Sequence, residues 1–178
     1  MRTASETARL TTIHNGSFFG RVRRNHGLEH ATLNLLALRY PRENIAGHSD
    51  GTGFWIIGNV TLEAVYTAVE EALERMRKGE THLAIHRNCG TNFVTAGVLA
   101  GTAAAVSMAG VGRSARKKLE RLPLAILMAT LALIVAQPLG FFLQEKVTTS
   151  GQPGDLQVIE ILASRRGQLN AFRVITRG

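Results

Sequence analysis

Apolar positions along the chain follow two different periods and predict a mixed α and β protein. A helical period runs from Ser17 to Leu38, and a second helix extends from Thr61, a favoured N-cap residue type, to Lys78. Shorter alternating or compact apolar segments bounded by turn residues read as strands. The predicted strands are 44–48, 54–58, 82–86, 156–162 and 169–175.

Two longer stretches are apolar without any period. Residues 92–111 and 122–143 contain no charged side chain, and each reaches the twenty or so residues needed to cross a hydrocarbon core. We therefore expect a transmembrane helical hairpin across 92–144, with a connection at 112–121. The alternative, a buried hairpin in a soluble protein, is disfavoured because so small a domain can hardly enclose two such helices.

The expected fold class is a small α+β domain on a two-helix transmembrane hairpin. Residues 17–91 and 148–178 would form the extramembrane domain, and the polar residues 1–16 a flexible tail. The chain would then be an integral membrane protein with two spans.

The charge of the chain is strongly positive but unevenly placed. The formal net charge is +8, and basic residues crowd the hairpin connection and the region before His26. Cations beside apolar spans usually meet anionic headgroups. The sequence shows no interleaving of aromatic and basic residues of the kind that forms a base-stacking surface, so nucleic acid is not an expected partner. The expected partners are a lipid bilayer, a membrane protein or a second copy of the chain, and the membrane orientation stays open.

The segment from His26 to His30 carries the candidate chemistry, because it reads H-x-x-E-H. Residues four apart share a helix face, so both imidazoles can reach one metal ion. Between them, Glu29 is placed where a carboxylate can act on a metal-bound water. This order is the inverted form of the zinc-protease motif H-E-x-x-H. The alternative is a buried histidine pair with ordinary hydrogen bonds.

Further donors are available at His86 and Cys89, whose H-x-x-C spacing lets both bind one ion across a turn. Together with His26 and His30 they make a complete tetrahedral set, which is typical of structural zinc. If only three of them bind, water takes the fourth position and Glu29 becomes the candidate general base. Nitrogen and thiolate donors favour zinc over iron or copper. Other candidates for the third ligand are His48, His82 and a glutamate, whereas His14 is not expected to take part.

Cys89 has a second interpretation as a nucleophile paired with His86. That arrangement needs a lowered thiol pKa and a third group to orient the histidine, such as Asn88 or Asn92.

Two motifs, NHGLEHAT at 25–32 and HRNCGTN at 86–92, precede a small-residue apolar stretch and a basic connection. In this combination the chain resembles a bacterial membrane-protein family known as domain of unknown function 6391, from about Arg24 to the C-terminal strands. Family members have proline where Arg87 stands here, which leaves the local turn open. The resemblance implies a protein of the bacterial cell membrane and no established activity. Similarity to inverted-motif zinc peptidases is confined to His26, Glu29 and His30.

Three functions are consistent with these residues. The first is a membrane-anchored zinc-dependent hydrolase, for example a peptidase, in which Glu29 activates a metal-bound water at the membrane surface. The second is a non-enzymatic accessory or assembly protein with a structural metal. The third is a membrane protein that binds a tetrapyrrole through one of the histidines.

Overall fold

The computed structural model describes residues 18–178, which divide into two units. Residues 18–86 and 145–178 form the first unit, and Arg87–Gln144 forms the second. The predicted tail, residues 1–16, lies outside the described residues.

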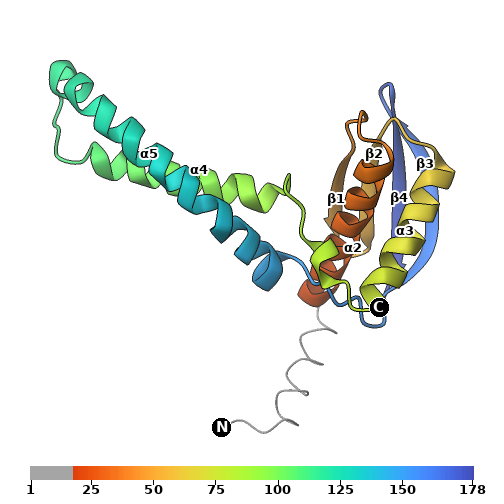
Figure 1. Cartoon of the computed structure of the whole chain (residues 1–178). Coiled ribbons are helices and arrows are strands. Elements are labelled where there is room, and N and C mark those ends of the chain that lie inside the picture. Colours follow the sequence, from red (N-terminus) through yellow and green to blue (C-terminus); the bar gives the residue numbers. More distant parts are fainter. Residues whose placement is uncertain (1–17) are drawn as a thin grey trace, which may run out of the picture. The chain divides into compact units, whose positions relative to one another are not determined.

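The first unit is an α+β domain in which two helices cover one face of an antiparallel sheet (Figure 1). The helices are α2, Phe18–Arg39, and α3, Leu62–Arg77. The sheet has the order β1-β2-β4-β3, so the last strand of the chain pairs with β2. Its strands are β1 Ala46–Asp50, β2 Gly53–Gly58, β3 Gln157–Arg166 and β4 Leu169–Arg177.

Alternation along the two central strands builds the core. Phe54 lies opposite Val174, and Ile56 lies opposite Phe172, with each side chain at most 3% exposed. Successive side chains of a strand point to opposite faces, so these four share the face that packs against the helices. Burying an apolar side chain of this size stabilises the fold by roughly 1.5–3 kcal/mol.

Local sequence signals are confirmed at the second helix and the first hairpin. The Thr61 hydroxyl accepts a hydrogen bond from the Ala64 N–H at 3.2 Å, as an N-cap should. Pairing of β1 with β2 continues to Asp50 opposite Gly53, so the turn between them is two residues long and tighter than expected.

The predicted strand at 82–86 is wrong, because Thr81–Ala84 forms the short 3₁₀ helix η1. Leu83 and Ala84 are both buried although they are adjacent, a pattern that an alternating strand does not give. The carbonyl groups of residues 83–85 accept hydrogen bonds from side chains of α2 and have no neighbouring strand as partner.

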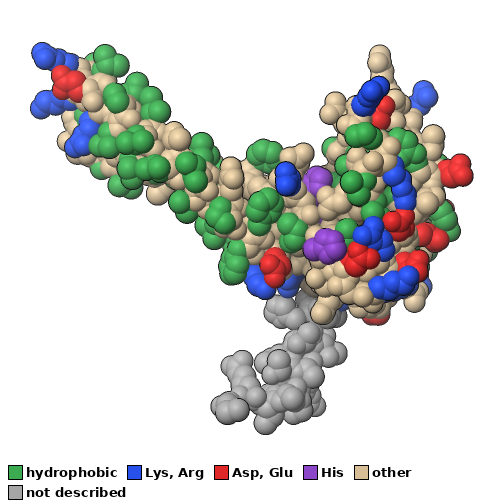
Figure 2. Space-filling view, in the orientation of Figure 1, with side chains coloured by type: hydrophobic (Ala, Val, Ile, Leu, Met, Phe, Trp, Pro, Cys, Tyr) green, Lys and Arg blue, Asp and Glu red, His purple; other side chains and the backbone are tan. Residues whose placement is uncertain are grey.

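The second unit is a helical hairpin made of α4, Gly90–Ser107, and α5, Ala115–Leu143, followed by the π-helical turn Gln144–Thr148. On α5, Ala125, Ala136 and Gly140 are buried, whereas most of the larger apolar residues of this helix are exposed (Figure 2).

The expected two-span transmembrane hairpin, and with it the expected two-span integral membrane localisation, must be corrected. Among the described helices only the one from Ala115 to Thr148, with a mean hydropathy of 2.2, is long and apolar enough to cross a membrane. Helix α4, which is rich in glycine, threonine and alanine, does not meet these criteria. One such helix does not establish a crossing, because core helices of soluble proteins meet the same criteria. The described residues form an α+β domain and a helical hairpin.

Candidate metal centre

Two histidines of α2 lie side by side with their rings oriented by backbone carbonyls. The ring centroids of His26 and His30 are 4.3 Å apart. His26 Nδ1 is 2.9 Å from the Thr148 oxygen, and His30 Nδ1 is 2.8 Å from the Ala84 oxygen. A carbonyl oxygen only accepts, so in the neutral imidazole each Nδ1 carries the proton and the lone pair is on Nε2. This is the tautomer in which a histidine binds a metal through Nε2.

A close approach of the chain to α2 makes the contact with His26 possible. The Ser150 N–H donates to the Arg23 oxygen, and the Arg23 guanidinium donates to the Thr149 oxygen. A Cβ at Gly27 would lie 2.1 Å from the Ser150 oxygen, so only glycine allows this packing. The glycine of the motif therefore brings the Thr148 carbonyl to His26.

His86 follows η1, and its ring centroid is 5.6 Å from that of His30. Its Nδ1 lies 2.8 Å from Oδ1 of Asn34, a residue of α2. Partial burial lowers the pKa of His86, which favours the neutral imidazole that a metal requires. Asn34, and not Asn88 or Asn92, is the amide side chain that contacts Nδ1 of this histidine; Asn92 donates to the Arg87 oxygen instead.

Cys89 is the N-cap of α4 and is buried, with its sulfur accepting from the Thr91 N–H at 3.4 Å. Candidate ligand atoms of His26, His30 and Cys89 all lie within 4.8 Å of one another. Cys89 comes only three residues after His86, so the chain itself keeps the two Cα atoms within about 11 Å of each other. The two motifs thus supply one group of nitrogen and sulfur donors that could hold a metal ion.

Glu29 is buried beside these histidines but turns toward the sheet. It is 4% exposed, and a Cβ at Gly47 of β1 would lie 2.4 Å from its Oε1. Glu29 is not a member of the group of donors within 4.8 Å. Its catalytic role stays a prediction.

The other candidate third ligands lie elsewhere in the domain. His48 is exposed on β1 and, by alternation from Gly47, faces away from α2. His82 is exposed and lines a cavity of about 520 Å³ together with Arg23 and Glu145. Neither belongs to the donor group, and His14 lies outside the described residues.

The supporting residues of the centre were not identified from the sequence. Arg23, Gly27 and Asn34 each orient a segment or ring through contacts with residues between 49 and 127 positions away. For Asn34 a local signal exists, because it continues the row of His26 and His30 by one further helical turn.

Comparison with known proteins agrees with the resemblance seen in the motifs. The family model described as "Domain of unknown function (DUF6391)" matches residues 21–161. An uncharacterized protein of Picosynechococcus sp. is 36% identical over an alignment of 143 residues. The match covers 72% of this chain and 66% of the relative, just under two thirds of its length. No solved structure matches. Neither description names a peptidase or a membrane protein. The chain belongs to the DUF6391 family.

Proposed function

We propose that this protein binds a zinc ion through His26, His30 and Cys89. The observation that carries the proposal is that their ligand atoms lie within 4.8 Å of one another. Both imidazoles are already held in the metal-binding tautomer by carbonyl groups of the backbone. Imidazole and thiolate donors suit zinc and are unsuited to magnesium or calcium.

The zinc ion has a structural role in a non-enzymatic accessory protein. His30 and Cys89 are buried at 2% and 4% exposure, as expected of ligands in a closed structural site. The carboxylate that hydrolysis would need, that of Glu29, lies against Gly47 of β1. An ion shared by α2 and the chain after η1 would hold these segments together, and its binding energy would add to folding stability.

A hydrolase is the second candidate, and one observation favours it. The group within 4.8 Å has three members, which leaves a fourth position for water. Glu29 directly precedes His30 and is the only acidic residue of α2. In a hydrolase, Glu29→Gln would keep the zinc and abolish turnover of ester or peptide substrates. If the zinc is structural, the same variant would alter neither the zinc content nor the fold beyond the loss of one buried carboxylate.

Elemental analysis of the purified full-length protein tests zinc binding. We expect one zinc per chain in the wild type and none in a His26→Ala, His30→Ala double variant. His48→Ala with His82→Ala is the matched control, because it removes two histidines outside the donor group and should keep the zinc. A wild-type protein that neither carries zinc nor takes it up on titration would refute the proposal.

An accessory protein needs a partner, and α5 offers a broad apolar surface for one. At about 100° per residue, the exposed leucine, isoleucine, valine and phenylalanine side chains from Leu124 to Phe142 cover an arc of roughly 240° around the helix. The alanine and glycine residues that pack on α4 occupy the remaining arc. A helix that packs on a single protein surface has a narrower apolar stripe than this arc. Lipid is therefore the partner that fits the arc best.

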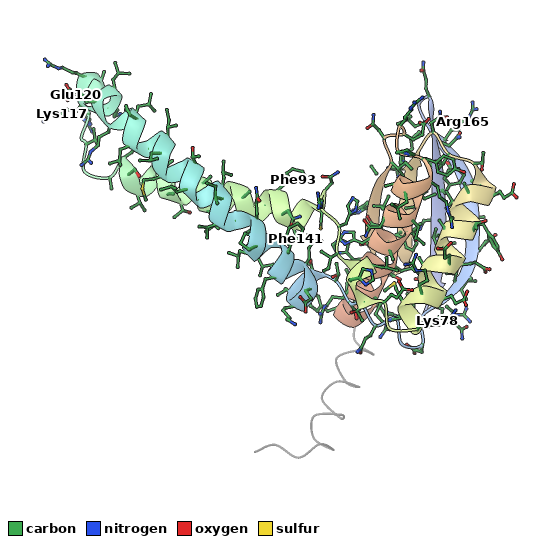
Figure 3. All side chains as sticks on the ribbon, in the orientation of Figure 1. Lys78, Phe93, Lys117, Glu120, Phe141 and Arg165 are labelled. Atoms are coloured by element: carbon green, nitrogen blue, oxygen red, sulfur yellow. The ribbon has the colours of Figure 1, made fainter. Side chains whose placement is uncertain are left out.

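The tip of the hairpin complements an anionic lipid surface. The five exposed cations there are Arg113, Arg116, Lys117, Lys118 and Arg121. Lys117 and Glu120 mark this tip in Figure 3, with Phe93 and Phe141 far from it along the hairpin. We expect the full-length protein to float with phosphatidylglycerol-containing vesicles. Replacing Arg116, Lys117 and Lys118 by glutamine should weaken this binding by roughly fivefold per cation.

The matched control replaces three exposed cations of the α+β domain, Arg42, Arg165 and Arg166, by glutamine and should bind as the wild type does. Equal losses in the two triple variants, or equal flotation with purely zwitterionic vesicles, would contradict an anionic lipid partner.

A further inference from the structure

Asn34 makes three hydrogen bonds that together fix its own orientation. Its Nδ2 donates to the Leu83 oxygen at 3.0 Å and to the Ile85 oxygen at 2.9 Å. Both hydrogens of the amide are therefore used, and Oδ1 is the atom that lies 2.8 Å from His86 Nδ1. A flipped amide would place its nitrogen against His86 and its oxygen against two carbonyl oxygens, which repel it.

The fixed amide determines which nitrogen of His86 carries the proton. Because Oδ1 of Asn34 only accepts, His86 must donate through Nδ1, and its Nε2 keeps a lone pair. His86 is then in the same tautomer as His26 and His30, whose Nδ1 atoms also contact oxygen acceptors. All three histidines offer the nitrogen that zinc requires.

His86 lies outside the group of donors within 4.8 Å, but it is the histidine next to that group. Its ring neighbours that of His30, and the H-x-x-C spacing places it one turn before Cys89. A tetrahedral zinc site with four protein donors is the usual arrangement of a structural centre.

We propose that His86 is the fourth zinc ligand and that Asn34 is the residue that positions it, giving a closed site of three histidines and one cysteine. This inference rests on the proposed zinc binding and decides between its two roles, because a fourth protein ligand excludes the catalytic water. The rings of His26 and His30 are held by backbone carbonyls, which no substitution removes, whereas the ring of His86 is held by a side chain. Asn34 is therefore the support that mutation can test.

The experiment measures zinc affinity by competition with a chelator, and coordination from the visible spectrum of the cobalt-substituted, full-length protein. We expect His86→Ala to weaken zinc binding and to replace the tetrahedral cobalt spectrum by a weaker one with bound water. Asn34→Leu, which cannot accept from His86, should weaken zinc binding by roughly 10–100-fold. In a His86→Ala background, Asn34→Leu should have no further effect on the affinity, because Asn34 acts through His86.

Asn34→Asp separates positioning of the ring from support of the backbone. Aspartate still accepts from His86 Nδ1 but cannot donate to the carbonyls of Leu83 and Ile85. We expect it to restore the tetrahedral cobalt spectrum that Asn34→Leu loses, even if the metal-free domain is less stable. A purely structural role for Asn34 would leave both variants equally impaired.

The inference and the proposed function fail in different ways. If His86→Ala and Asn34→Leu keep wild-type zinc affinity and cobalt spectrum while the His26, His30 double variant loses its metal, zinc binding stands and the fourth ligand is refuted. That result would favour the open, hydrolytic site. If no variant and no wild-type protein binds zinc or cobalt, both proposals fall.

Discussion

Replacing Gly27 by alanine tests whether the segment after α5 packs on the metal-binding helix. In an ordinary helix interior this change stabilises by about 1 kcal/mol, because alanine is the better helix former. Here the new Cβ would lie 2.1 Å from the Ser150 oxygen, at least 0.9 Å inside the 3.0 Å that real Cβ atoms keep. The obstacle is backbone, so the chain at 148–150 has to move.

The magnitude follows from the contacts that this movement breaks. Overpacking of this kind costs roughly 1–3 kcal/mol. The hydrogen bonds from Ser150 N–H to the Arg23 oxygen and from Arg23 to the Thr149 oxygen contribute about 1 kcal/mol each. After subtracting the helix-propensity gain, we expect Gly27→Ala to lower the free energy of unfolding by about 2–4 kcal/mol.

Urea unfolding of the full-length protein, followed by the fluorescence of Trp55, measures this change. Trp55 is the only tryptophan and lies on β2, so it reports on the α+β domain. Gly97→Ala in α4 is the matched control, because a Cβ there meets nothing within 4 Å and should leave the Trp55 transition unchanged. If Gly27→Ala is as stable as Gly97→Ala, the segment does not lie against α2 and His26 loses its carbonyl anchor.

Three further substitutions probe other contacts of the domain. Gly47→Ala should lower the free energy of unfolding by about 1 kcal/mol, which is less than for Gly27→Ala. The reason is that the new Cβ meets the end of the Glu29 side chain, which can shift, and not backbone. An equal loss of stability in urea unfolding would contradict this. Burial by itself raises the pKa of the Asp50 carboxyl, but hydrogen bonds from Arg173 and Thr52 lower it to about 2. A pKa below the unfolded value of 3.8 means that the ionised carboxylate stabilises the fold above pH 4, and that this contribution disappears as the pH falls to 2. Because the Asp50 side chain is 44% exposed, we expect its ion pair with Arg173 to stabilise the fold by only about 1 kcal/mol. Asp50→Asn should lack this contribution. Acid unfolding curves identical to those of the wild type would refute it. Thr61→Ala should cost about 1 kcal/mol by removing the α3 N-cap, and a serine at that position should restore it in the same assay.

The elements with strong local signals were predictable from the sequence. The bounds predicted for the second helix agree with α3 because its cap residues, Thr61 and Lys78, are recognisable in the sequence. The first hairpin was predictable because strand alternation and turn residues are local signals. The predicted strand at 82–86 failed for the opposite reason. Its backbone is satisfied by side chains of α2, about fifty residues away, and no local pattern reports that.

The membrane prediction shows a related limit. The prediction of two spans rests on freedom from charge over twenty residues, but among the described helices only the one from Ala115 to Thr148 meets the length and hydropathy criteria. Meeting these criteria does not establish that α5 crosses a membrane, because core helices of soluble proteins meet them too.

For the candidate centre, the sequence alone determined which donors exist and that two of them share a helix face, because spacing on a helix is a local property. Only the tertiary structure decided that Cys89 comes within 4.8 Å of these histidines and that Glu29 turns to β1. It also decided which ring nitrogen of each histidine faces a hydrogen-bond acceptor. These depend on hydrogen-bond acceptors at Thr148, Ala84 and Asn34, and on a glycine that admits the chain. Such partners are distant in sequence, and it is packing that brings them to the ligands.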